Sequence, residues 1–130
     1  QQMIKLILLI TTLSLNQGVQ NKIKVYKDVF YKVNIPYTQI KTEIVFKLDQ
    51  YKQLAFMVCK SEDIDCEKHY TDAEITLTYI NGKQNQYESI FHTFEAKKTY
   101  YFKFRAIYEI DVEIIVNTAQ LLFDHARAQV

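Results

Sequence analysis

Hydrophobic and polar residues alternate with a period of two along most of this chain. The alternation is clearest in three stretches, Thr38–Leu48, Thr99–Tyr108 and Glu109–Val116. Within the first of these, Ile44 and Phe46 fall on one face and Lys47 falls on the other. Such alternation is typical of a β-strand with one face in the hydrophobic core and the other in water. The sequence therefore predicts antiparallel strands over most of its length.

Five shorter runs show the same alternation: Lys22–Tyr26, Val29–Ile35, Leu54–Cys59, Glu74–Ile80 and Gln86–Phe94. Between the last two runs, Asn81-Gly82 is typical of a type I′ hairpin, whose central residues need positive φ. Pro36 ends a strand because it has no N–H to donate. The sequence thus predicts an all-β fold, an antiparallel β-sandwich of jelly-roll or Greek-key type with seven or eight strands. A closed barrel that carries a ligand is the alternative.

The two ends of the chain are predicted to lie outside this domain. Lys5 precedes an apolar run, Leu6–Leu15, and a polar stretch that ends near Gly18, the order found in a cleavable signal peptide. The run of roughly ten residues is about half the length that a membrane-spanning helix needs, so no stable span is expected. We therefore expect a signal peptide at 1–20, the sandwich domain at 21–117 and a helical tail at 118–130. A buried strand or helix of the domain itself, or an uncleaved anchor, are the alternatives for the N-terminal run.

Charge and composition exclude several classes of function. Sixteen basic and fifteen acidic residues give a net charge of +1, and only Arg105 and Arg127 are arginines, so a nucleic-acid-binding surface is not expected. Two glycines in 130 residues disfavour glycine-rich phosphate loops. A hydrophobic fraction of 48% favours a folded domain over disorder.

Two cysteines, Cys59 and Cys66, are predicted to form a disulfide bond in an oxidising compartment. The bridge would close a loop of six residues and contribute about 2–3 kcal/mol to stability. Two buried free thiols are the alternative. The acidic loop Glu62–Glu74 overlaps this loop and includes Asp63, Asp65 and Glu67, whose oxygens suit calcium. We expect a solvated loop there, with calcium as the weaker alternative and no other cofactor.

No set of residues predicts catalysis. His69, His92 and His125 are far apart and lack the close spacing of metal ligands. His92 is expected to point outward, beside Glu88. A serine nucleophile would need a glycine-rich turn that the sequence lacks, so the protein is expected not to be an enzyme.

Several large apolar residues fall out of phase with the inward positions of their strands. They are Ile80, Ile90, Tyr101, Ile107 and Ile115. If they are contiguous on the folded domain, they form an exposed patch that binds a protein partner or a second copy of the chain. Cover by the C-terminal helix is the alternative.

Three segments resemble the bacterial pre-peptidase C-terminal (PPC-like) β-sandwich family. They are Asp28–Pro36 (DVFYKVNIP), Asp72–Gly82 (DAEITLTYING) and Lys98–Ala106 (KTYYFKFRA), within a similarity that covers roughly residues 24–116. The resemblance implies a small jelly-roll accessory domain of secreted or surface proteins, non-catalytic and sometimes with a calcium site. This chain differs by its cysteine-bounded acidic loop and its few glycines.

These observations together predict a secreted or cell-surface, non-catalytic β-sandwich module with a structural, adhesive or protein-interaction role. The alternative function is that of an extracellular domain that binds carbohydrate or another small ligand, because its ten tyrosines offer rings with an apolar face and a polar tip.

Overall fold

Nine β-strands make up the part of the chain that the computed structural model describes, residues 10–37, 40–49, 51–60, 73–84 and 86–118. The strands are β1 (Thr11–Thr12), β2 (Val19–Ile23), β3 (Val29–Asn34), β4 (Ile40–Leu48), β5 (Gln53–Cys59), β6 (Ala73–Asn81), β7 (Glu88–Phe94), β8 (Thr99–Ala106) and β9 (Ile110–Thr118). Strands β2–β9 overlap the eight alternating runs of the sequence, so the predicted all-β class is confirmed. The predicted count of seven or eight is low by one or two, and the strand without a matching run in the sequence is β1, which has only two residues. Residues 119–130, which include nearly all of the predicted C-terminal helix, lie outside the described residues.

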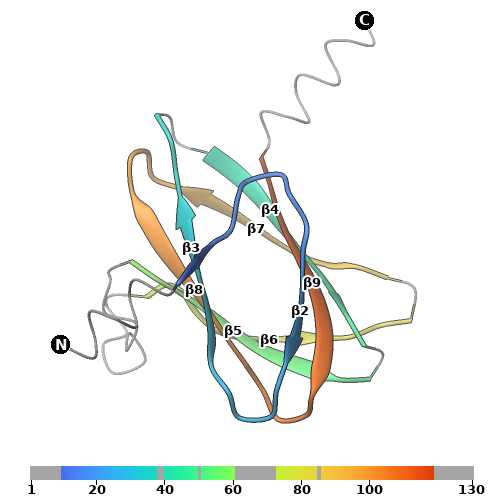
Figure 1. The fold of residues 1–130 in the computed structure, drawn as a ribbon. Helices are drawn as coiled ribbons and strands as arrows, with labels where there is room; N and C mark the ends of the chain where they lie inside the picture. Colours follow the sequence, from blue (N-terminus) through green and yellow to red (C-terminus); the bar gives the residue numbers. More distant parts are fainter. Residues whose placement is uncertain (1–9, 38–39, 50, 61–72, 85, 119–130) are drawn as a thin grey trace, which may run out of the picture.

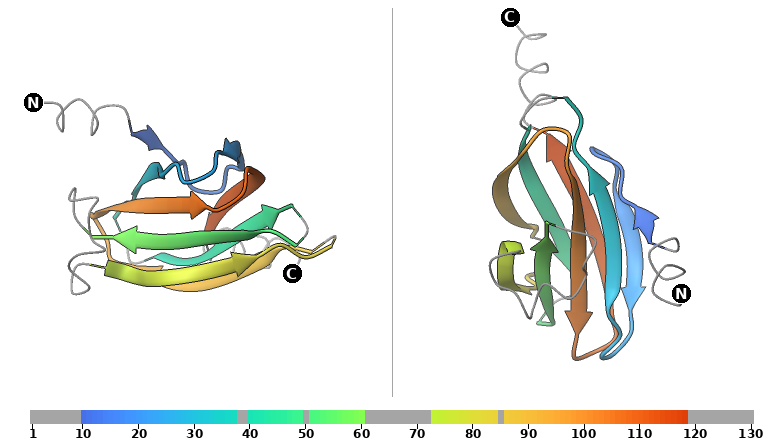
Figure 2. Two further views of the ribbon diagram at one scale, coloured as in Figure 1. Left: turned by 90° about the horizontal axis from the view of Figure 1, so that it is seen from below. Right: turned by 90° about the vertical axis from the view of Figure 1, so that its left-hand side faces the viewer.

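The strands form two sheets that face each other (Figures 1 and 2). The five-stranded sheet has the order β1-β3-β8-β5-β6, and the four-stranded sheet has the order β2-β9-β4-β7. Neighbouring strands are antiparallel except for β1 and β3, which are parallel. Among the described strands, β5 and β6 are the one consecutive pair that also lie side by side in a sheet. The other connections cross between the sheets. The register of nearly every strand pair is therefore set by contacts between residues that are far apart in the sequence.

The hydrophobic core fills the space between the sheets from the inward positions of the alternating strands. Phe46 of β4 contacts Phe56 of β5 edge to face, with ring centroids 5.1 Å apart. Phe56 also contacts Phe102 of β8 at 5.4 Å. Edge-to-face contacts are favourable because the positive edge of one ring meets the negative face of the other. The alternation predicted for Glu109–Val116 is confirmed in β9, where every second side chain is at most 2% exposed: Ile110, Val112, Ile114 and Val116.

Residues 10–18 form part of the sandwich. Leu13 is 1% exposed within the main core, and its backbone N–H donates a hydrogen bond to Lys32 O of the five-stranded sheet at 2.8 Å. The backbone N–H of Asn16 donates to Val116 O of the four-stranded sheet, also at 2.8 Å. The sandwich therefore begins well before the boundary predicted at residue 20, because Leu13 fills a core position. Residues 1–9 lie outside the described residues.

The Asn81-Gly82 pair does not form the predicted two-residue hairpin. Strands β6 and β7 belong to different sheets, and neither of the two glycines has a positive φ. Instead, Gly82 N donates to Lys52 O at 2.8 Å and Gly82 O accepts from Tyr51 N at 3.2 Å. A Cβ atom at Gly82 would overlap the carbonyl oxygen of Asp49. Glycine is needed here for the close approach of two backbones.

Candidate functional site

The outer face of the five-stranded sheet carries a hollow of about 160 Å³ that includes Ala55. Ala55 on β5 lies directly opposite Tyr79 on β6 and Arg105 on β8. Directly opposed side chains on one face of a sheet lie side by side, so the short methyl group of Ala55 forms a low point between two long side chains. The other residues that line the hollow are Met57, Leu77, Lys103 and Ile107.

Three of the side chains that line this hollow are apolar and open to solvent. Tyr79 is 57% exposed, Ile107 is 48% exposed and Leu77 is 46% exposed. Single exposed apolar side chains are ordinary on protein surfaces, but several that share one concavity are typical of a binding site. The hollow is therefore a candidate surface for contact with another molecule.

A β-bulge in β6 brings this apolar surface to the outside. Between two paired positions, β5 advances by two residues (56–58) while β6 advances by three (75–78). An extra residue in one strand reverses the face to which the following side chains point. As a result, Leu77 and Tyr79 are exposed, while Ile80 lies in the core.

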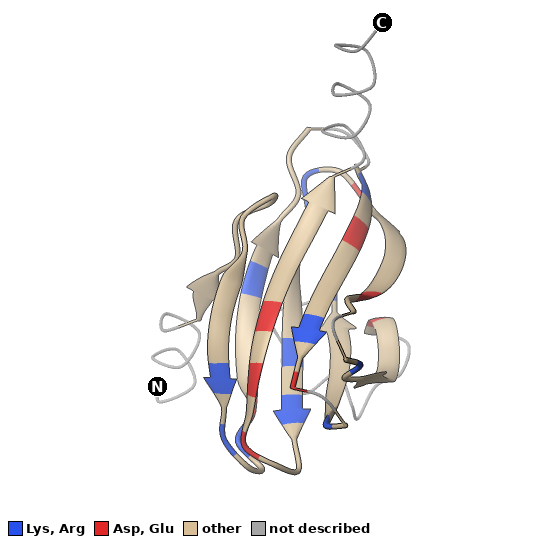
Figure 3. Ribbon diagram, turned by 90° about the vertical axis from the view of Figure 1, so that its right-hand side faces the viewer, with Lys and Arg blue, Asp and Glu red and all other residues tan. Residues whose placement is uncertain are grey.

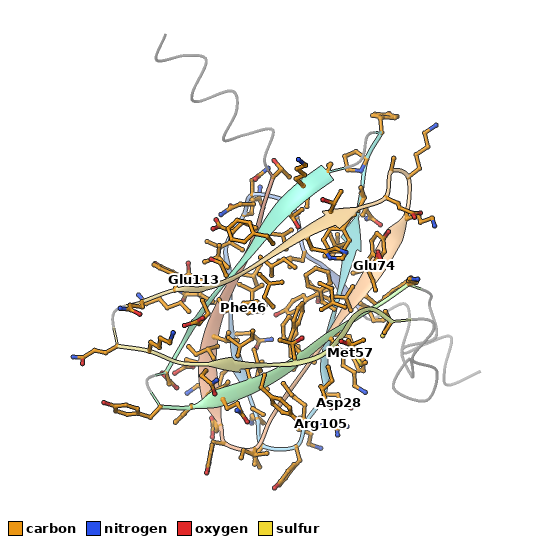
Figure 4. All side chains as sticks on the ribbon, turned by 180° about the vertical axis from the view of Figure 1, so that it is seen from behind. Asp28, Phe46, Met57, Glu74, Arg105 and Glu113 are labelled. Atoms are coloured by element: carbon orange, nitrogen blue, oxygen red, sulfur yellow. The ribbon has the colours of Figure 1, made fainter. Side chains whose placement is uncertain are left out.

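Arg105 is held beside the hollow by Asp28 (Figure 4). Arg105 Nε donates to Asp28 Oδ1 at 2.6 Å and Nη2 donates to Oδ2 at 2.9 Å. Lys103 is 6% exposed, and its Nζ lies 3.9 Å from the same carboxylate and 5.9 Å from the centroid of the Phe30 ring. Because a two-pronged contact fixes the plane of the guanidinium group, the polar side of the hollow has a defined shape.

The five residues predicted to form an interaction patch do not come together. Ile107 lies on the hollow. Ile90 and Ile115 are partly buried in β7 and β9 of the other sheet. The prediction that Ile80 and Tyr101 face solvent is wrong, since they are 5% and 4% exposed.

Each of these two errors has a physical cause. The bulge in β6 turns Ile80 inward, against the phase of the sequence. Tyr101 does point to the outer face, but it is buried in a small cluster with Met57 and Cys59. Alternation alone could not reveal Leu77 and Tyr79 as site residues, because it gives no sign of the bulge.

The remaining predicted site residues lie mostly outside the described residues. Cys59 is fully buried at the end of β5, but Cys66 is among the residues outside, so the disulfide stays a prediction. The same is true of the weak calcium candidates, which are Asp63, Asp65 and Glu67. Within the described residues, no group of three or more His, Cys, Asp or Glu side chains is arranged to hold a metal ion. The described part of the chain contains no helix long and apolar enough to cross a membrane.

Of the three histidines, His69 and His125 also lie outside the described residues. The prediction that His92 points outward is wrong. Its Nε2 atom is buried and lies 3.5 Å from Oε1 of Glu74 on β6.

Comparison with solved structures identifies related folds. The pre-peptidase C-terminal domain of a collagenase from Bacillus anthracis matches with a TM-score of 0.59 at 11% identity, over 82% of this chain and 93% of that domain. This chain has a fold similar to a pre-peptidase C-terminal domain. The similarity inferred from three short segments of the sequence is therefore confirmed at the level of the fold.

Two weaker similarities cover a comparable share of the chain. PliG of Aeromonas hydrophila, a periplasmic inhibitor of g-type lysozyme, has a TM-score of 0.47 at 10% identity over 82% of this chain and 96% of that chain. CorA of Methylomicrobium album BG8, a surface-associated copper-binding protein, has a TM-score of 0.46 at 9% identity over 81% and 97%. No protein-family model and no curated protein sequence matches the chain.

Proposed function

We propose that this chain is a non-catalytic β-sandwich module of a secreted or cell-surface protein and binds a protein partner through the hollow beside Ala55. The observation that carries the proposal is the row Arg105–Ala55–Tyr79, where one short side chain lies between two long ones on a sheet. Tyrosine and arginine are enriched at the energetic centres of protein interfaces. A low point between them suits a single apolar side chain of a partner.

The size and shape of the hollow define the partner. A volume of about 160 Å³ is below the roughly 300–1,000 Å³ of typical small-molecule pockets. We therefore expect an apolar anchor, such as leucine or methionine, presented by an exposed loop or an extended segment. Because Asp28 already fixes Arg105, little side-chain freedom is lost on binding, and this favours affinity.

The extracellular location rests on the sequence. Two cysteines that can pair across a short loop favour an oxidising compartment. The apolar N-terminal run adds no independent support, because Leu13 within it packs in the core of the sandwich. The similarity of fold adds no argument about a partner, because one fold serves many functions.

A peptide-library selection tests the proposal. The folded protein serves as bait for a random displayed peptide library, and the affinity of each enriched peptide is measured by fluorescence polarisation. We expect enriched peptides to share one apolar anchor position, and we expect Ala55→Leu to weaken their binding by about 10-fold or more, because the new side chain fills the low point.

The matched control is Ser89→Leu, which adds the same side chain at an exposed position of the four-stranded sheet. It should change the affinity by less than about 2-fold. Circular dichroism and thermal unfolding establish that both variants are folded. Equal binding by wild type and Ala55→Leu would exclude the hollow as the contact site.

A further inference from the structure

A second concavity, of about 370 Å³, lies on the outer face of the four-stranded sheet. It lies where β2, β9 and the end of β4 run side by side, on the opposite side of the sandwich from the hollow at Ala55. Its polar lining comes from Gln20, Lys22, Lys47, Asp49, Asp111 and Glu113. This volume falls within the range typical of small-ligand sites. We call this concavity the β2–β9–β4 cleft.

Donors and acceptors alternate across the cleft. In one row, Glu113 on β9 lies between Gln20 on β2 and Lys47 on β4. In the next row, Asp111 on β9 lies opposite Lys22 on β2. Figure 3 shows this arrangement as acidic positions along β9 between basic positions on the neighbouring strands. The Glu113 carboxylate therefore has an amide group on one side and an ammonium group on the other. The Asp111 carboxylate has the Lys22 ammonium group on one side, and on the other side its backbone N–H donates to Asp49 Oδ2 at 3.0 Å.

The ionic groups of the cleft are only loosely paired with one another. Lys22 Nζ lies 3.9 Å from Asp111 Oδ1, with both side chains more than half exposed, and such surface pairs are weak. Lys47 Nζ lies over the ring of Tyr87, 5.6 Å from its centroid. Within the described residues, the Glu113 carboxylate takes part in no hydrogen bond or ion pair. It can therefore accept hydrogen bonds from a ligand without breaking an existing contact.

The mixed charges select the chemistry of the ligand. An anion in the cleft would meet the carboxylates of Asp49, Asp111 and Glu113, and a cation would meet the ammonium groups of Lys22 and Lys47. A hydroxyl group both donates and accepts hydrogen bonds, so a neutral molecule with many hydroxyls can satisfy both kinds of group at once.

One aromatic side chain stands beside the cleft, on the β7 side of the sheet. The Tyr87 ring is 55% exposed, and its centroid lies 5.6 Å from Nζ of Lys47, which lines the cleft. An exposed ring offers a flat apolar face, which suits the C–H face of a pyranose.

From the row of donors and acceptors, the Glu113 carboxylate that makes no hydrogen bond or ion pair within the described residues, and the exposed Tyr87 ring, we propose that the β2–β9–β4 cleft binds a neutral oligosaccharide. Carboxylates of Asp111 and Glu113 accept hydrogen bonds from its hydroxyls, and Lys22 and Gln20 donate to them. Tyr87 stacks on one ring of the sugar chain. This site is separate from the hollow that carries the proposed protein interaction, so either can fail without the other.

Nuclear magnetic resonance titration of the isotope-labelled protein tests the site. The probes are cellohexaose, maltohexaose, xylohexaose and chitohexaose, with hexagalacturonate as the anionic comparison and glucose as the monomer. We expect at least one neutral hexasaccharide to bind with a dissociation constant on the order of 0.1–1 mM and to shift the amide signals of β2, β9 and the end of β4. Glucose should bind at least about 10-fold more weakly.

Two matched pairs of variants locate the binding. Glu113→Ala should weaken the hexasaccharide about 10-fold, whereas Glu43→Ala, another partly exposed outward glutamate on the same sheet, should change the affinity less than about 2-fold. Tyr87→Ala should weaken it about 5-fold, whereas Tyr37→Ala, beyond the far end of β4, should not. The proposal is overturned if no neutral hexasaccharide binds at about 10 mM, if hexagalacturonate binds better, or if the shifted signals map to the five-stranded sheet. It is also overturned if Glu43→Ala and Glu113→Ala behave alike. None of these outcomes bears on the peptide selection at Ala55.

Discussion

Nε2 of His92 lies 3.5 Å from Oε1 of Glu74 and connects the outermost strands of the two sheets. Glu74 belongs to β6, the edge of the five-stranded sheet, and His92 belongs to β7, the edge of the four-stranded sheet. The His92 ring also packs against Phe94, with centroids 4.7 Å apart. Because β6 and β7 are not hydrogen-bonded to each other as strands, this side-chain contact helps to close that side of the sandwich.

The contact between Glu74 and His92 should be measurable as a coupling free energy. A double-mutant cycle with Glu74→Gln and His92→Gln should give a coupling of about 0.5–1.5 kcal/mol, because the two side chains meet across the edges of the two sheets. Urea unfolding of the wild-type protein, the two single variants and the double variant measures it. A coupling of zero would show that the two side chains contribute independently to stability.

Buried tyrosines should make the fold sensitive to alkali. Burial raises the pKa of the Tyr100 hydroxyl, against a lowering by the hydrogen bond from Glu95 N, and the Glu74 carboxylate raises it further. Burial likewise raises the pKa of Tyr31, despite the hydrogen bond from Asn21. The folded state thus keeps protons that unfolded tyrosines release above about pH 10, so these groups reduce stability as the pH rises beyond that value.

The variant Tyr100→Phe should therefore lose less stability than wild type between about pH 9 and pH 11.5. Tyr51→Phe, at an 88% exposed position, is the control and should follow wild type. Urea unfolding at several alkaline pH values measures the difference. Identical slopes for Tyr100→Phe and wild type would contradict the stated role of burial.

Lysine should destabilise the protein much less at the surface residue Ile107 than at the buried residue Tyr101. The free energy of unfolding of Ile107→Lys should lie within about 0.5 kcal/mol of the wild-type value, because the side chain is about half exposed. Tyr101→Lys should lose about 3 kcal/mol or more, because it buries a charge beside Met57 and Cys59. Thermal and urea unfolding give both values, and similar stability of the two variants would contradict the burial of Tyr101.

The two glycines should respond differently to alanine. Gly82→Ala should lose about 2–4 kcal/mol, because its Cβ would overlap the Asp49 carbonyl and break the contact with Lys52. At Gly18 an added Cβ would lie 3.4 Å from a side-chain carbon of Ile115, so Gly18→Ala should change stability by less than about 1 kcal/mol. Equal losses in the two variants would mean that the backbone contact at Gly82 is unimportant.

The predicted disulfide can be tested on the intact protein. Without reductant, thiol titration in denaturant should detect no free thiol, and mass spectrometry of a digest should find the peptides of Cys59 and Cys66 linked. Cys59→Ala together with Cys66→Ala should lower the stability by about 2–3 kcal/mol. Two titratable thiols in the wild-type protein would rule out the bridge.

Much of the fold follows from the alternation in the sequence. The runs Val29–Ile35 and Leu54–Cys59 match β3 and β5 to within one residue at each end, because the pattern of burial along a strand is a local property. The strand β1 was missed, since two residues carry no period and lie within an apolar run that also resembles an export signal. Leu13 illustrates the ambiguity, because a leucine is expected both in the apolar part of a signal peptide and in a hydrophobic core.

The sequence by itself determined most of the residues that form strands and, for regular strands such as β9, which face is buried. The tertiary structure alone decided which strands lie side by side, and this placed Ala55 between Tyr79 and Arg105 and placed Glu113 between Gln20 and Lys47. It also decided the bulge that exposes Tyr79 and buries Ile80. The physical reason is that alternation is set by each strand's own burial, whereas pairing and register depend on contacts between strands that are far apart in the chain.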